Sequence, residues 1–170
     1  MTEQGIPAKV LEIAEGIKTM RIRGAGKIAR AVAEALKIAA LEYGGVKEVA
    51  PFKRYMGKVA DLIIATRPTA VSLPNAVMYV LSSLHRANPG TFEDAVNTVV
   101  LTAEKFIEES INAVKVISET AARRIRENSI ILTHCHSSVA VSAITEAYKL
   151  GRVVKVYSTE TRPFYQGRIT

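Results

Sequence analysis

Hydrophobic residues recur every three or four positions through residues 1–128, which is the period of amphipathic helices. The first such stripe follows Pro7 and ends at a glycine-rich break near Arg23. Four further helices are expected, over residues 27–43, 52–65, 74–87 and 91–127. Ser72 is the expected cap of the helix that follows it, and Thr91 begins a capping-box pattern, TFED. The last helix contains no glycine or proline, and it should be about 50 Å long at about 1.5 Å per residue.

The pattern changes after the long helix. Residues 130–132 form a short, continuous apolar run, as in a buried parallel strand. A helix is expected over 138–150 and a second strand over 153–157. This β-α-β order predicts a right-handed crossover and a parallel sheet. We therefore predict an α/β protein, with an all-helical N-terminal domain (1–128) followed by the first β-α-β unit of a parallel-sheet domain (129–170).

Two parallel strands do not make a stable sheet on their own. The chain nevertheless stops at Thr170, soon after the second strand. We therefore expect it to be the first part of a longer protein, or to need a partner. The isolated chain should expose an apolar edge and face of its sheet, and it should self-associate.

Composition narrows the class of protein. Apolar residues make up 48% of the 170, which suffices for a core without disulfide staples. The single cysteine, Cys135, excludes an internal disulfide framework and fits a reducing cytosol. No apolar run approaches about 18 residues and no signal-peptide pattern follows Met1, so we expect a cytoplasmic protein with no membrane partner.

The chain is basic, with a formal net charge of +7, so an anionic partner is expected. Nucleic-acid surfaces usually gather their charge in one stripe, with aromatic residues nearby. Here the arginines stand singly in turn-like segments, at Arg23, Arg67, Arg162 and Arg168. Arginines scattered beside glycine, threonine and proline suit a small phosphorylated ligand better than a duplex, so nucleic acid is not the expected partner.

Cys135 lies where the first strand ends and the next helix begins. Open α/β sheets bind ligands at the carboxyl ends of their strands, and the backbone N–H groups of Ser137 and Ser138 are placed there to bind an anion. The helix dipole and a neighbouring histidine favour the reactive thiolate. A small buried thiol in the core is the alternative interpretation. Strand alternation should turn His134 and His136 away from the thiol, so we predict no metal site.

Three more segments carry candidate anion ligands. RIRGAG places Arg23 before Gly24 at a helix start, although a plain helix–helix turn is the alternative. ATRPTAVSLPNAV places Arg67 in a rigid turn bounded by proline. STETRPFYQGR follows the second strand and contributes Glu160, Arg162, Gln166 and Arg168. Any one of these arginines could simply be a charged surface residue, which is the alternative interpretation. Three such turns in one short chain favour a shared anion site instead.

In order and spacing, RIRGAG, TRPTAVSLPNAV, ILTHCHSS and TETRPFYQGR resemble segments of the initiation-factor-2B-related isomerases, over essentially all 170 residues. The resemblance implies a helical N-terminal domain and a Rossmann-like C-terminal domain. The family has three branches: ribose-1,5-bisphosphate isomerases, methylthioribose-1-phosphate isomerases, and regulatory subunits related to translation initiation factor 2B. Cys135 disfavours the regulatory branch. Gly26 and the pair Ser137-Ser138 are similar to the ribose-1,5-bisphosphate branch.

The resemblance implies an aldose–ketose isomerase that converts ribose 1,5-bisphosphate to ribulose 1,5-bisphosphate in archaeal AMP and nucleoside metabolism. Cys135 matches the family's catalytic thiol. The positions that match its phosphate- and sugar-binding segments are Arg23, Gly24, Arg67, Ser137, Ser138, Arg162, Gln166 and Arg168. The implied partners are a phosphorylated sugar, AMP as a nucleotide activator, and further copies of the chain in a homo-oligomer. No cofactor or metal is implied.

The chain departs from the family at the second catalytic group. The family's catalytic aspartate lies in a later Gly-Ala-Asp segment, whereas only Glu146 and Glu160 follow Cys135 as acids here. We therefore expect the isolated chain to be inactive. The first alternative function is a non-catalytic regulatory subunit that binds a nucleotide or sugar phosphate. The second is a methylthioribose-1-phosphate isomerase.

Overall fold

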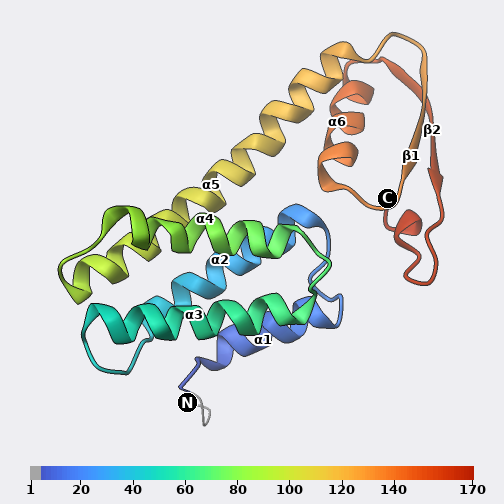
Figure 1. Ribbon diagram of the computed structural model, residues 1–170. Helices are drawn as coiled ribbons and strands as arrows, with labels where there is room; N and C mark the ends of the chain where they lie inside the picture. Colours follow the sequence, from blue (N-terminus) through green and yellow to red (C-terminus); the bar gives the residue numbers. More distant parts are fainter. Residues whose placement is uncertain (1–4) are drawn as a thin grey trace. The chain divides into compact units, whose positions relative to one another are not determined.

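The computed structural model describes residues 5–170 (Figure 1). The helices of the first part are α1 Ala8–Lys18, α2 Ala25–Leu41, α3 Val49–Thr66, α4 Ser72–Ala87 and α5 Phe92–Arg124. The elements that follow are β1 Ser129–His134, α6 Ser138–Lys149, β2 Val153–Thr159 and the short 3-10 helix η1 Gln166–Arg168. This order confirms the predicted α/β class. None of the described helices combines the length and apolar character that crossing a membrane requires.

Internal contacts divide the chain into two compact units, and the division falls within α5. The first unit ends at Glu109, and the second comprises Ser110–Thr170. We call them the helical unit and the sheet unit. Residue 129, where we predicted a domain boundary, is the point at which helices give way to strands. The boundary between domains stays a prediction.

The core of the helical unit is centred on α2. Ala33, Ala35, Leu36 and Ala39 on this helix have no exposed surface. Helix α2 contacts α1, α3 and α4. Its alanines let these neighbours approach closely, because each alanine side chain is a single methyl group in a close-packed interior. Burying a side chain such as Leu36 contributes about 1.5–3 kcal/mol of transfer free energy.

Four aromatic rings form a cluster in the helical unit. The ring centroid of Tyr43 lies within 5.8 Å of those of Phe52, Tyr55 and Phe92. These separations lie in the range in which aromatic pairs attract. The Tyr55 hydroxyl is buried and has no hydrogen-bond partner among the residues that the structure describes. Burial raises the pKa of Tyr55 to about 12, and the carboxylate of Glu42 adds to the effect.

Strands β1 and β2 of the sheet unit are parallel neighbours, as predicted. Their register pairs Ile131 with Val156 and His134 with Thr159. A small core joins the sheet to its helices, and its buried members are Ala122 of α5, Ala147 of α6 and Val153 of β2. The carboxyl ends of both strands therefore meet at one edge, which is where ligands of open α/β sheets bind.

Within the sheet unit, Arg152 ties the end of α5 to the residue before β2. Its Nη1 atom donates hydrogen bonds to the carbonyl oxygens of Arg123 and Ile125, each at 2.8 Å. The last carbonyl groups of a helix have no partner within the helix. A cation near this negative end of the dipole is also electrostatically favourable. Arg152 therefore satisfies backbone groups at the end of α5 that the helix itself leaves without a partner.

One face of the two-stranded sheet is open. Ile131 and Thr133 are half-buried, whereas Ile130 and Leu132 are 63% and 71% exposed. This alternation follows from the two-residue period of a strand. Parallel sheets ordinarily have both faces covered. The predicted exposed apolar face is confirmed, and self-association of the chain stays a prediction.

Some helix ends differ from the sequence predictions. The predicted Ser72 cap is wrong, because Ser72 is the first residue of α4 and no side chain caps that helix. Helix α3 begins at Val49, earlier than predicted, because Pro51 is tolerated in a first turn, where its missing N–H loses no helical bond. Thr91 does cap α5: its hydroxyl accepts a hydrogen bond from the Asp94 N–H at 3.1 Å.

Candidate active site

Cys135 occupies the junction between β1 and α6, as predicted. Its φ of +61° lies in the left-handed region, which residues other than glycine rarely adopt. Such a conformation costs about 1–3 kcal/mol and persists where surrounding contacts hold it. The residue is half-buried. A thiol that only fills a core requires neither this backbone strain nor partial exposure.

The two histidines beside Cys135 have separate partners. His134 ends β1, and its Nδ1 atom lies 2.6 Å from the hydroxyl of Thr159. The Nδ1 atom of His136 lies 3.1 Å from the hydroxyl of Thr170. Because the chain leaves the extended conformation at Cys135, strand alternation stops there, and the argument from alternation is wrong for His136. Within residues 5–170, no group of three or more His, Cys, Asp or Glu side chains could hold a metal ion.

Ser137 and Ser138 form the start of α6, directly after the cysteine junction. Ser137 is the N-cap residue, and its hydroxyl accepts a hydrogen bond from the Ala140 N–H at 3.3 Å. Ser138 is the first residue of the helix. The first N–H groups of a helix lack partners within it and coincide with the positive end of its dipole. This end of α6 can therefore accept an anion next to Cys135.

The segment after β2 carries the other predicted residues of the sheet unit. Arg168 in η1 donates from Nε to Glu160 Oε2 at 3.1 Å, and its guanidinium carbon lies 4.8 Å from the centre of the Tyr165 ring. Gln166, the first residue of η1, is half-buried. Arg162 is exposed, and its guanidinium pairs with no other described residue. One arginine is thus held in place, and the other extends into solvent.

This segment folds back on the carboxyl edge of the sheet. Gly167 lies so close to the carbonyl group of Thr159 that a Cβ atom at position 167 would collide with it. The Thr170 hydroxyl donates a hydrogen bond to the Cys135 carbonyl oxygen at 2.8 Å. Figure 1 accordingly shows the C-terminus beside the connection between β1 and α6. The cysteine junction, the start of α6 and the segment after β2 therefore belong to one edge of the sheet unit.

The structure brings Arg23 and Arg67 to one end of the helical unit. Arg23 precedes Gly24, which is the N-cap residue of α2 and has a φ of +87°. Arg67 directly follows α3 as its C-cap residue. Lys18 and Thr66, the last residues of α1 and α3, line one pocket, so these helix ends are neighbours. Both arginines are half-buried, and neither guanidinium has a partner among the described residues. Their convergence with the thiol on one ligand stays a prediction.

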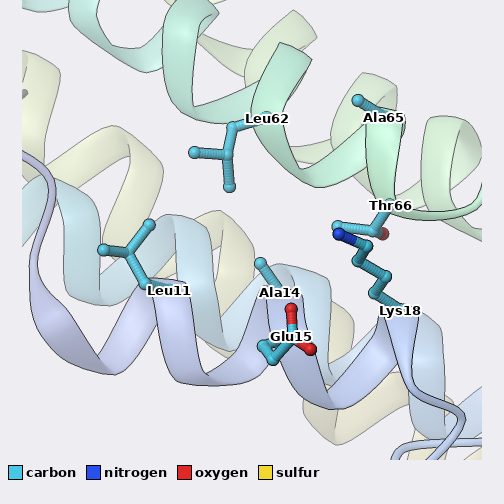
Figure 2. A pocket seen from close by; sticks show the side chains of 7 residues that line it. All are labelled: Leu11, Ala14, Glu15, Lys18, Leu62, Ala65 and Thr66. Atoms are coloured by element: carbon cyan, nitrogen blue, oxygen red, sulfur yellow. The ribbon is translucent and has the colours of Figure 1, made fainter.

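A groove of about 410 Å³ lies between α1 and α3 (Figure 2). Its lining residues are Leu11, Ala14, Glu15, Lys18, Leu62, Ala65 and Thr66. No predicted site residue lines it. Its apolar lining residues are Leu11 and Ala14 of α1 and Leu62 and Ala65 of α3, and Glu15 and Lys18 both come from α1 (Figure 2). Sequence reasoning missed this groove because its two walls come from helices far apart in the chain.

The chain matches known proteins along nearly its whole length. Residues 21–170 match the family model described as the Initiation factor 2 subunit family. The chain is 44% identical over 167 residues to ribose 1,5-bisphosphate isomerase of Pyrococcus furiosus, covering 97% of this chain and 51% of that protein. It is 45% identical over 161 residues to the Methanocaldococcus jannaschii protein of the same name, covering 95% of this chain and 50% of that protein. The chain thus spans about half the length of these curated relatives.

A solved structure shows the same fold. The translation initiation factor eIF-2B of Pyrococcus horikoshii superposes with a TM-score of 0.79 at 26% identity, over 96% of this chain and 54% of that one. Fold and site together define an α/β protein in which a helical part precedes a parallel β-α-β unit with a cysteine at its carboxyl edge. The chain belongs to the Initiation factor 2 subunit family.

Proposed function

We propose that this chain carries the substrate-binding residues and one catalytic group of an aldose–ketose isomerase that converts ribose 1,5-bisphosphate to ribulose 1,5-bisphosphate. One observation carries the proposal: a strained, half-buried cysteine stands at the strand–helix junction of a chain 44% identical to a ribose 1,5-bisphosphate isomerase. Backbone strain in folded proteins gathers at functional sites. A protein that only binds its ligand has no chemical use for such a thiol.

The reaction requires a proton to move between neighbouring carbons of the sugar. One group must remove the proton and one must deliver it. We assign one of these roles to Cys135. The acids that follow it in the chain are engaged elsewhere, because Glu160 pairs with Arg168 and Glu146 pairs with Lys149 at 2.8 Å. The second proton-transfer group is therefore not assigned to this chain, which we expect to be inactive alone.

The arginines are proposed to bind the two phosphate groups of the substrate. A guanidinium group grips phosphate through two parallel hydrogen bonds, which a lysine does not reproduce. Arg162, Arg168 and Gln166 stand on the same edge of the sheet unit as the start of α6, where Ser137 and Ser138 lie. The proposed ligands from the helical unit are Arg23, Gly24 and Arg67. The guanidinium groups of Arg23, Arg67 and Arg162 have no partner within residues 5–170, which supports this proposal.

The proposal is tested by turnover in the product of the complete reading frame that contains this chain. Formation of ribulose 1,5-bisphosphate is the readout. Methylthioribose 1-phosphate is the matched competitor, because it lacks the 5-phosphate. We expect it to react about 10²-fold less efficiently or worse, since a polar site left unpaired discriminates strongly. Absence of turnover with ribose 1,5-bisphosphate would overturn the proposal.

A non-catalytic regulatory subunit is the second candidate, and the structural similarity to translation initiation factor eIF-2B favours it. Such a subunit would bind a nucleotide or sugar phosphate without converting it. The two candidates separate in one experiment that measures binding by calorimetry and turnover on the same sample. Binding of ribose 1,5-bisphosphate without product formation supports the regulatory role, and product formation excludes it.

We also propose a homo-oligomer, AMP as an activator, and a cytoplasmic location. The exposed apolar side chains of Ile130 and Leu132 support self-association, because apolar surface of this kind is ordinarily covered. Light scattering over a range of protein concentrations tests the oligomer. Turnover with and without AMP tests the activator.

A further inference from the structure

Thr170 joins the segment after β2 to the cysteine junction. Its Oγ1 atom lies 2.8 Å from the Cys135 carbonyl oxygen and 3.1 Å from His136 Nδ1. Both distances are ordinary hydrogen-bond lengths. One hydroxyl group therefore contacts both the backbone of the cysteine and the side chain of the residue after it.

The proton count of this hydroxyl determines the state of the histidine. A carbonyl oxygen only accepts, so the single proton of the Thr170 hydroxyl points to Cys135. The bond to His136 then requires Nδ1 to donate its own proton to the threonine oxygen. In the neutral ring, the proton is consequently on Nδ1 and the lone pair is on Nε2. When the ring is protonated at Nε2, the Nδ1 donor is unchanged.

Three sets of contacts restrain the left-handed conformation of Cys135. Before it, β1 is paired with β2 up to His134. After it, Ser137 caps α6. The bond from Thr170 is made to the backbone carbonyl of the cysteine itself. A strained residue persists only where several contacts hold it together.

We propose that Thr170 and His136 are positioning residues that clamp Cys135 in its left-handed conformation. The threonine holds the carbonyl group of the cysteine, and the histidine orients the threonine. Because Arg162 and Arg168 precede Thr170 in the same short segment, the clamp also holds the backbone of that segment beside the cysteine junction. The catalytic purpose of the clamp rests on the proposed function, whereas the clamp itself does not.

Thiol labelling tests the clamp, because Cys135 is the only cysteine in the chain. Thr170→Val removes the hydroxyl at nearly constant volume, and Thr170→Ser is the matched control that keeps it. A hydrogen bond is worth about 0.5–1.5 kcal/mol net. Its loss should raise the fraction of molecules in which the cysteine junction is unclamped by about two- to tenfold. We therefore expect a bulky aromatic disulfide reagent to label Cys135 in the Thr170→Val variant about two- to tenfold faster than in the parent. The serine variant should label at the parent rate, and equal rates in all three proteins would overturn the proposal.

Nitrogen-15 NMR of the histidine rings supplies a second readout, which loss of packing alone would not move. The neutral ring of His136 should carry its proton on Nδ1 in the parent and in Thr170→Ser, and lose this preference in Thr170→Val. His136→Gln identifies its signal among the three histidines of the chain. A proton on Nε2 in the parent would overturn the proposal. Neither readout uses substrate, so absence of isomerase activity would leave the clamp standing.

Discussion

Replacing Tyr55 with phenylalanine should stabilise the helical unit. The hydroxyl is buried without a partner among the described residues, and an unsatisfied buried polar group costs about 1–3 kcal/mol. The ring itself remains, and its centroid lies 4.8 Å from that of Tyr43, so little packing is lost. We expect the free energy of unfolding at neutral pH to rise by about 1 kcal/mol, the lower end of that range.

The pH dependence follows from the raised pKa of Tyr55, about 12 in the folded chain. A free tyrosine titrates near pH 10. Between about pH 10 and 12 the unfolded chain therefore loses this proton while the folded chain keeps it, so the contribution of Tyr55 to stability is complete below pH 10 and falls as pH rises. Phenylalanine has no such proton. The advantage of the variant should therefore grow as pH rises above 10.

Urea denaturation of parent and variant at pH 7, 9 and 11 measures both effects. Tyr79→Phe is the matched control: its ring also packs on an aromatic neighbour, Phe106, but its hydroxyl donates to the exposed carboxylate of Glu109 at 3.2 Å. This control should change stability by less than about 0.5 kcal/mol. A Tyr55→Phe variant less stable than the parent at pH 7 would refute the reasoning, because it would mean that the hydroxyl has a favourable partner.

Three further predictions concern the sheet unit. In the catalytically competent protein, Cys135→Ser should lower kcat by about 10²–10⁴-fold and leave substrate binding, measured by calorimetry, largely intact. A kcat within about threefold of the parent is far short of that range and would mean that Cys135 is a structural thiol with no catalytic role. Arg152→Met should destabilise the sheet unit by about 1–3 kcal/mol, because the last carbonyls of α5 lose a charged donor; chemical denaturation followed by circular dichroism measures this, with exposed Arg126→Met as control. Gly167→Ala should displace the segment after β2, because a Cβ atom at position 167 collides with the backbone of Thr159. With pyrophosphate as the probe of the proposed anion site, we expect this variant to bind several-fold more weakly in calorimetry. An unchanged affinity for pyrophosphate would show that this segment does not bind the anion.

Periodicity predicted the helices, because each of them buries one face. The strands were predicted from short apolar runs instead, and only β1 shows alternating burial, since β2 buries Val153 alone. The long helix ends at Arg124, close to the predicted end, and the strand pair has the predicted parallel order. The backbone conformation and the hydrogen-bond partners at the site could not be predicted from the sequence, because contacts between distant residues determine them. Nothing local indicates that Cys135 adopts a left-handed conformation, since this needs partners on three sides. Thr170 was not a candidate, because its role depends on how the segment after β2 folds back.

The open face of the sheet also bears on how the chain is made. Strand β1 leaves the ribosome before α6 and β2, so Ile130 and Leu132 emerge while their strand has no neighbour. Parallel pairing is slow because it must await a distant segment. During that interval an apolar strand with unpaired backbone groups is the kind of surface that aggregates or is bound by chaperones. The two-residue alternation that leaves these side chains exposed in the folded sheet unit therefore also makes residues 129–134 a segment of the nascent chain that a protective partner would shield.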